Sequence, residues 1–409
     1  MNRRRRFLAA LAAAPALALP GCLGTFQVFN RCASAGDEGH RVDPELTARI
    51  WEGLDPALVM DAHVHLAGEG PGPDDPWVNP AMRTPANPFS FAHFALMANA
   101  ACMPYEESLW NRQYVERLLA LLGEFPPGAK ALLLALDGWR DASGRLDRRR
   151  TVFTVPDAYV EAVARAHPER FEWAASIHPY REDALERLRW AVAHRARAVK
   201  WIPYFMNIDP ASPRIAPFYR ALARSGLPLI THGGWEHELV EGGDQELGNP
   251  LRIRAALQEG VRVIVAHCAM QGDFLDTDRG PGRTPRPSFE LFARLMDSRE
   301  YVDLLYGDLS AVTIGGRQPG ALRRLLTSES WQPRLVNGSD YPGPGIVPVM
   351  SLKTLVDEGV LAAEEVGRLA HIQHHNPMLF DFAVKRRIAW RGGRWPASAF
   401  ETQRLFRAG

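Results

Sequence analysis

Short apolar runs alternate with amphipathic helical patterns along most of this chain, and this alternation limits the folds open to it. Eight runs of β type occur, most of them separated by segments with apolar residues at i, i+3, i+4 and i+7. Such alternation predicts a parallel sheet, and eight units predict an α/β fold of the closed (β/α)8 TIM-barrel type. A doubly wound open sheet is the alternative, but no G-x-G-x-x-G motif follows the first run. The predicted strands are 58–62, 131–136, 171–177, 198–202, 227–231, 261–266, 302–306 and 334–338.

A long segment after the first predicted strand, residues 67–109, is dense in Pro, Gly and Asn. Loops of this length are usually functional or disordered. In a barrel this loop would follow the carboxyl end of a strand, so we expect it to cover the C-terminal face, where active sites lie. We predict that the barrel spans residues 51–388, between a linker at 23–50 and a C-terminal extension at 389–409.

The first 22 residues, MNRRRRFLAALAAAPALALPGC, have a basic start and an apolar Ala/Leu stretch. They resemble a secretory signal peptide that ends in a bacterial lipobox at Cys22, although Pro20 is unusual there. The run RRRFL also fits the twin-arginine pattern R-R-x-F-L. We therefore expect export from the bacterial cytoplasm and a lipid anchor on Cys22 that holds the protein to the membrane on the periplasmic side. A plain secretory signal is the alternative.

Composition excludes some classes of function. The chain of 409 residues is 46% hydrophobic, which is ample for a core, and its net charge of +1 does not indicate a nucleic-acid partner. Beyond Cys22 there are three cysteines, Cys32, Cys102 and Cys268, whose spacing is typical of neither a zinc site nor a disulfide framework. We expect them to be incidental. Nothing in the sequence indicates an oligomeric state.

Residues that bind metals occur at the same end of several predicted strands. His63 and His65 follow the first strand, and side chains at i and i+2 of a strand point the same way. An H-x-H pair alone is a weak signal, but four more such residues occur at later strands. Because the carboxyl ends of barrel strands meet at one mouth, the set predicts a site for a divalent cation, with imidazole and carboxylate ligands. The other four residues are Lys200, His232, His267 and Asp340.

This pattern resembles the amidohydrolase superfamily, and most closely its amidohydrolase-related (type 2) branch of metal-dependent hydrolases. The motifs DAHVH, VKWIP, HPY and GSDYP carry the resemblance, which covers about residues 55 to 385. The resemblance implies that His63, His65 and Asp340 hold a buried divalent metal, zinc in the first place and manganese as an alternative.

The resemblance leaves the number of ions open. It implies that His232 binds either the same ion or, with His267, a second one. Lys200 matches a lysine that carbon dioxide carboxylates in binuclear relatives, where it bridges two ions. The alternative is an ordinary ammonium group that binds a substrate carboxylate or pairs with an acid.

The implied reaction begins with water. A divalent metal lowers the pKa of a bound water from ~15.7 to about 7. Asp340 would accept the water proton and pass it to the leaving group, while the metal or His267 polarises the scissile carbonyl. This chemistry predicts hydrolysis of an amide, ester or lactone bond in a small molecule.

Two other functions are open. The same site in this branch also supports metal-dependent, non-oxidative decarboxylation, although decarboxylase relatives generally lack the lysine that Lys200 matches. A lipid-anchored binding protein without catalysis is the third reading. A serine-hydrolase mechanism is not indicated, because the G-x-S-x-G motif is absent.

Weaker candidates for substrate binding follow from position alone. His178 ends the third predicted strand, Trp201 and Tyr204 could form an apolar wall, and Glu236 lies on a Gly-bearing loop. Their alternatives are a place at the start of a helix or in packing for His178, packing for the aromatic residues, and a solvated loop for Glu236. Asp308, after the seventh strand, could orient a ligand imidazole, but a helix N-cap is slightly favoured.

Overall fold

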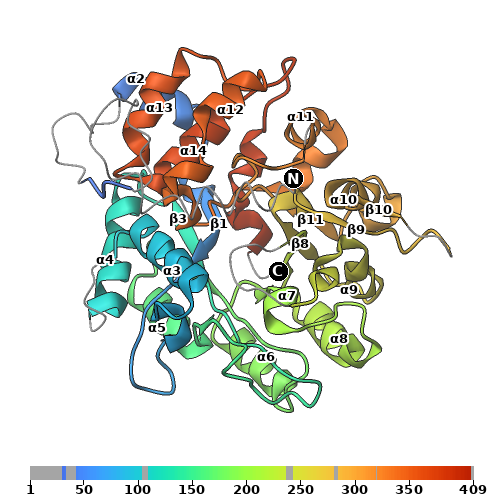
Figure 1. Ribbon diagram of the computed structural model, residues 1–409. Coiled ribbons are helices and arrows are strands. Elements are labelled where there is room, and N and C mark those ends of the chain that lie inside the picture. The colour runs from blue at the N-terminus through green and yellow to red at the C-terminus, as the bar shows by residue number, and fades with distance from the viewer. Residues whose placement is uncertain are drawn as a thin grey trace.

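The fold is taken from a computed structural model, which describes residues 30–33, 43–103, 109–235, 243–280, 284–318 and 320–406. Figure 1 shows strands at the centre of the molecule with helices around them. Within the described residues, eight parallel strands follow the predicted order. They are β1 (Met60–His65), β3 (Lys130–Leu134), β5 (Phe171–Ala174), β6 (Val199–Trp201), β7 (Leu229–His232), β8 (Val263–Ala266), β11 (Leu305–Asp308) and β12 (Leu335–Val336).

These strands close into a barrel. They form two parallel groups, in the orders β1-β3-β5 and β12-β11-β8-β7-β6. At one junction the N–H of Lys200 donates to the Ala175 carbonyl at 2.7 Å, and at the other the N–H of Ala62 donates to the Asn337 carbonyl at 2.9 Å. Hydrogen bonds therefore join both edges, which confirms the predicted TIM barrel. The seventh strand was placed too early: Val302 is 45% exposed, and the strand begins at Leu305.

A small apolar cluster fills the barrel, and Tyr306 of β11 packs against it. The bottom is closed by the 3-10 turn η14 (Thr402–Phe406). Phe406 joins the inner cluster, and the Thr402 hydroxyl donates to the Met60 carbonyl at 2.6 Å. The segment predicted as a C-terminal extension is thus part of the barrel floor. The cluster's other buried residues lie in strands, except Ala198, which directly precedes β6: Met60, Ala62, Leu132, Leu134, Ala174, Ala198, Ile230, Ile264 and Val336.

Amphipathic helices cover the outside, each in a segment where the apolar periodicity predicts one. They are α4 (Trp110–Gly123), α5 (Asp157–Ala166), α6 (Ala184–Ala193), α8 (Ala216–Ser225), α9 (Arg254–Gln258), α10 (Ser288–Met296) and α11 (Ala321–Thr327). Three further helices follow β12: α12 (Leu352–Asp357), α13 (Glu365–Gln373) and α14 (Pro377–Arg387).

The predicted linker extends too far. Residues Pro44–Trp51 form helix α2, whose Leu46 and Ile50 are fully buried. Trp51 stacks on Phe382 of α14, with ring centroids 4.7 Å apart. An apolar face at helical spacing therefore makes this segment part of the barrel's outer layer.

The long loop after β1 contains structure of its own. It includes β2 (Trp77–Val78), the turn η3 (Pro80–Arg83) and helix α3 (Pro88–Ala100), and β2 pairs with β4 (Phe153–Thr154). Just beyond α3, the Ala101 carbonyl accepts a hydrogen bond from the Tyr341 hydroxyl at 3.3 Å. The loop therefore lies at the carboxyl ends of β1 and β12, as predicted.

Two cysteines that were predicted to be incidental form a disulfide. Cys32 and Cys102 are bonded across a sequence separation of 70 residues. Beside them, the Asn30 N–H donates to the Asn99 side chain at 2.8 Å, and the Asn99 amide donates back to the Asn30 carbonyl at 3.1 Å. Spacing gave no signal because folding, not proximity in the chain, brings the N-terminal segment to the end of α3.

The leader and Cys22 lie outside the described residues, so export and lipidation remain predictions. In the part of the chain that is described, every helix is too short or too polar to cross a bilayer.

Candidate metal centre

The first strand delivers His63 and His65 to the barrel mouth by means of a β-bulge. The pairing of β1 with β3 changes register between Asp61 and Val64. Ala62 belongs to the inner cluster, whereas Val64 belongs to the outer core, although a regular strand would place both on one face. The bulge shifts the alternation so that the two imidazoles face the interior.

Three of the predicted ligands come together in a compact group. The Nε2 atoms of His63 and His65 lie 3.3 Å and 3.2 Å from Oδ1 of Asp340. One donor atom from each residue lies within 4.8 Å of the others. Two imidazole nitrogens and a carboxylate oxygen are a donor set that suits a divalent cation such as zinc or manganese. The residues therefore fit the implied metal.

Lys200 joins this group from the opposite side of the barrel. Its side chain is 1% exposed, and Nζ lies 2.9 Å from Nε2 of His63. The fourth barrel strand thus places this amine beside His63, and a role for Lys200 in metal binding stays a prediction. Its carboxylation remains a prediction.

His232 and His267 complete the set. Their ring centroids lie 4.9 Å apart, and that of His267 lies 5.4 Å from the ring of His63. Nε2 of His267 is 4.0 Å from Oδ2 of Asp340. The two oxygens of Asp340 therefore face different partners: Oδ1 faces the first-strand histidines and Oδ2 faces His267.

Buried partners fix the orientation of two of the imidazoles. Nδ1 of His63 contacts Oδ2 of Asp308 at 2.5 Å, and Nδ1 of His267 donates to the Ser310 carbonyl at 3.0 Å. A proton held on Nδ1 leaves the Nε2 lone pair available for a cation. Asp308 also accepts the Ser310 N–H at 2.7 Å, but this contact closes a turn. The predicted helix N-cap is wrong, because the next described helix, α11, begins only at Ala321. The role of Ser310 was missed, and nothing in its sequence context could have signalled it.

This arrangement corrects one predicted role of His267. Polarising a carbonyl would require a proton on Nε2. The bond to the Ser310 carbonyl places the proton on Nδ1 instead, because a carbonyl oxygen can only accept. His267 is therefore arranged as a ligand or a proton acceptor.

The charges of the site match the needs of a cation. Burial lowers the pKa of His65, lowers that of His232 well below its usual value, and lowers that of His267 to about 3. Burial also raises the pKa of Asp340, but the neighbouring His267, His63 and His65 outweigh it and hold that pKa well below its ordinary range. At neutral pH the imidazoles of His65, His232 and His267 are therefore neutral and the Asp340 carboxylate is ionised, which are the forms that bind metal.

Both predicted catalytic residues have left-handed backbones. His267 has a φ of 58° and Asp340 a φ of 64°. For residues other than glycine this conformation costs about 1–3 kcal/mol, and it persists where the surroundings impose it. Such strain concentrates at functional sites, which agrees with the assignment of these two residues.

Two of the weaker candidates are placed elsewhere. Nε2 of His178 bonds the Met206 carbonyl at 2.8 Å and Nδ1 accepts the Tyr180 N–H at 3.1 Å, so the backbone occupies both ring nitrogens. The prediction that His178 contacts substrate is not supported. Trp201 follows Lys200 on the strand and points outward, where its ring lies 5.6 Å from that of Phe218. The predicted role of Trp201 in a pocket wall is wrong because successive strand residues face opposite sides.

Tyr204 and Glu236 belong to the loops around the mouth. Tyr204 lies in the short helix α7 (Pro203–Met206), and its hydroxyl accepts the Gly243 N–H at 3.2 Å. It therefore borders the segment that follows β7, and its contact with substrate stays a prediction. Glu236 lies outside the described residues.

Similar solved structures include three from bacteria. An uncharacterised TIM-barrel protein from Bordetella bronchiseptica is 14% identical, with a TM-score of 0.47 over 80% of this chain and 99% of that one. A probable 2-pyrone-4,6-dicarboxylic acid hydrolase from Acinetobacter baumannii is 13% identical, with a TM-score of 0.44 over 79% and 98%. A 5-carboxyvanillate decarboxylase from Novosphingobium aromaticivorans, complexed with manganese, is 11% identical, with a TM-score of 0.47 over 87% and 97%. No curated protein matches the chain.

The family comparison covers the site directly. The amidohydrolase family model matches residues 60–345, more than half of the chain, from the start of β1 to beyond Asp340. All six predicted metal-centre positions lie within the match, and the resemblance in the sequence motifs is confirmed. The chain therefore belongs to the amidohydrolase family, in its type 2 branch.

Proposed function

We propose that this protein is a metal-dependent hydrolase that uses an activated water to cleave an amide, ester or lactone bond of a small molecule. The observation that carries the proposal is the place of Lys200, whose Nζ lies 2.9 Å from His63 beside the His63–His65–Asp340 group. The full set of family positions is thus retained and assembled. Enzymes of this family act on small molecules with a divalent metal, which the donor set here fits.

The protein's own residues supply binding and proton transfer. A divalent cation, when bound, supplies Lewis acidity that acidifies a water and polarises a carbonyl. His63, His65 and Asp340 would hold it, and His232 and His267 lie close enough to bind the same or a second ion. Asp340 presents Oδ2 away from the first-strand histidines, so that oxygen can accept the proton of water and return it to the leaving group.

The experiment is metal analysis combined with turnover on a panel of lactones, N-acyl amino acids and dihydroxybenzoates. Hydrolysis of a lactone or amide by the zinc- or manganese-loaded protein supports the proposal. Release of carbon dioxide from a dihydroxybenzoate without hydrolysis would replace it with decarboxylation. Tight binding without turnover of any compound would indicate a binding protein.

The number of ions decides the role of Lys200. If this lysine is carboxylated and bridging, purified protein should hold close to two divalent ions per chain, and Lys200→Ala should lower both metal content and activity. Short carboxylic acids should then restore part of the activity. A single ion that is unchanged in Lys200→Ala would reject the bridging role.

We also propose that the protein is exported and held at the cell envelope through Cys22. The leader supports this, and so does the Cys32–Cys102 disulfide, because such bonds persist in oxidising compartments. Fractionation of cells that express wild type and Cys22→Ser tests it. Wild type found soluble in the cytoplasm with residues 1–21 attached would reject the proposal.

A further inference from the structure

Helix α14 carries two ionisable side chains that lie wholly inside the protein. The side chain of Lys385 is 0% exposed and that of Asp381 is 1% exposed. Nζ of Lys385 lies 2.5 Å from Oδ2 of Asp381 and 2.5 Å from the carbonyl oxygen of Gly338. Charged groups are almost never buried so fully, and desolvating such a pair opposes folding. The proposed reaction does not use these residues, so their place needs another explanation.

The carbonyl that Lys385 holds belongs to a segment in direct contact with the metal centre. A Cβ atom on Gly338 would lie 2.6 Å from Cβ of His63 and 2.8 Å from Oδ1 of Asp308. Only a glycine backbone can approach so closely. A movement of Gly338 would therefore displace His63 and the Asp308 carboxylate that orients the His63 ring.

Asp61 holds the next residue of the same segment. Its Oδ1 accepts the N–H of Ser339 at 2.8 Å and the N–H of His63 at 3.1 Å. One buried oxygen of Asp61 thus links the backbone of His63 to that of Ser339, the residue before Asp340. Lys385 and Asp61 fix two consecutive residues, Gly338 and Ser339.

Asp340 follows these residues in a conformation that needs support. Its φ of 64° lies in the left-handed region, which residues other than glycine rarely adopt. Its N–H donates to the His63 carbonyl at 2.8 Å, and its carbonyl accepts the Gly343 N–H at 2.8 Å. A shift of the preceding residues would rotate the carboxylate away from His63 and His65.

We propose that Lys385 and Asp61 are positioning residues that set where the Asp340 carboxylate lies in the metal centre. The proposal rests on the proposed function only for metal binding by His63, His65 and Asp340. A purely structural role would fasten α14 to the barrel and leave the geometry of the metal unchanged. Metal affinity and metal spectra therefore separate the two roles.

The main test compares two variants of the full chain. Asp381→Asn keeps the amine that donates to Gly338, whereas Lys385→Met/Asp381→Asn removes it without leaving a buried charge. Chelator competition gives the affinity for Co²⁺, and visible absorption reports its coordination. We expect Asp381→Asn to match wild type. The double variant should bind Co²⁺ about 10–100-fold more weakly, the range typical of partners that orient ligands, and with a changed spectrum.

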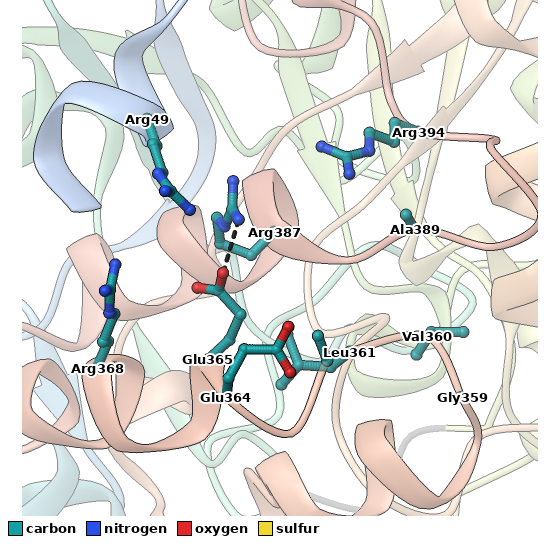
Figure 2. A pocket seen from close by; sticks show the side chains of 11 residues that line it. Arg49, Gly359, Val360, Leu361, Glu364, Glu365, Arg368, Arg387, Ala389 and Arg394 are labelled. Atoms are coloured by element: carbon teal, nitrogen blue, oxygen red, sulfur yellow. Dashed lines mark hydrogen bonds and ion pairs between the residues drawn. The ribbon is translucent and has the colours of Figure 1, made fainter. Parts of the chain in front are cut away.

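A matched control lies on the same helix. Arg387 pairs with Glu365 at 2.6 Å at the outer end of α14, as Figure 2 shows, and this pair does not reach Gly338. Glu365→Gln should lower the melting temperature while Co²⁺ affinity and spectrum stay unchanged. Should the double variant not fold, Asp61 gives a second comparison. Asp61→Asn keeps an oxygen for the two amides and should bind Co²⁺ as wild type does, whereas Asp61→Val should bind it at least about tenfold more weakly.

The outcomes separate this inference from the proposed function. A folded double variant, or Asp61→Val, with wild-type affinity and spectrum overturns the positioning role and leaves the hydrolase proposal intact. Equal losses in Asp381→Asn and the double variant also overturn it, because the former keeps the bond to Gly338. Expected losses in a protein that turns over no substrate would support the inference and reject the function. A wild type that binds no Co²⁺ rejects both.

Discussion

Two groups of ionisable residues in this protein differ in how their members are arranged. One is the candidate metal centre at the barrel mouth. The other surrounds a cavity of about 490 Å³ between α2, α13 and the end of α14 (Figure 2). Its charged lining residues are Arg49, Glu364, Glu365, Arg368, Arg387 and Arg394.

Around the cavity, several acidic and basic side chains form ion pairs. Arg387 contacts Glu365 at 2.6 Å, and Arg368 and Arg49 contact Glu45 at 3.3 Å and 2.5 Å. Each of these contacts joins a donor to an acceptor, as in an ordinary ion-pair network between helices.

At the mouth, acceptors converge instead. The Nε2 atoms of His63 and His65 and a carboxylate oxygen of Asp340 face one another, although each carries lone pairs. A group of converging nitrogen and oxygen ligand atoms of this kind suits a divalent cation. The comparison teaches that the direction of lone pairs, rather than the volume of a cavity, marks the functional site.

Of the variants considered, Asp340→Asn should have the largest effect, which is a loss of turnover. Asparagine can still offer an oxygen to a metal but cannot accept a proton, and general-base assistance is worth ~10²–10⁴-fold. Turnover should therefore fall at least about a hundredfold while a substantial share of the metal is retained. Steady-state kinetics and elemental analysis measure the two quantities. A metal-replete variant with near-normal turnover would move the base role to His267.

Removing the Cys32–Cys102 disulfide tests whether the structure of the barrel mouth depends on this covalent bond. Cys32→Ser should lower the free energy of unfolding by about 2–4 kcal/mol, because Cys32 and Cys102 close a long loop. Metal content should not change, since the ligands are held by their own hydrogen bonds. Denaturant titration of the variant, and of wild type with reductant, should agree. Loss of metal in the variant would show that the tether shapes the site.

Asp308→Asn should weaken metal binding at the barrel mouth without removing a ligand. The neutral amide cannot stabilise the Nδ1–H of His63 as the carboxylate does, so metal affinity should fall about 10–100-fold. Chelator competition measures this. Asp297→Asn, in the exposed pair with Arg324, is the control and should leave affinity unchanged. Equal affinity in Asp308→Asn and wild type would remove the orienting role from Asp308.

The smallest effect is expected in the cavity. Arg49 and Glu45 have side chains that are 44% and 54% exposed, and such pairs contribute about 0–1 kcal/mol. Arg49→Ala should therefore change the free energy of unfolding by less than about 1 kcal/mol and leave kcat/KM unchanged. Thermal unfolding and kinetics check this. A large loss of kcat/KM would show that the residues around the cavity contribute to activity, and the distinction between the two groups would then be wrong.

The sequence by itself determined the barrel and which residues gather at its mouth. Strand and helix periodicities are local, so they can be read without the fold. The closure rule of a (β/α)8 barrel then brings the carboxyl ends of distant strands together. For that reason His63, His65, Lys200, His232 and Asp340 could be assigned to one site from their positions alone.

Only the tertiary structure decided how those residues are supported. Asp61, Ser310 and Lys385 act through hydrogen bonds to groups far away in the chain, and no local pattern records such partners. The same holds for the bond between Cys32 and Cys102. The position of a proton also depends on the fold. The carbonyl of Ser310, in the loop after β11, holds the proton of His267 on Nδ1. Sequence patterns report which side chains are present and which face they occupy, whereas partners and proton positions exist only once the chain has packed.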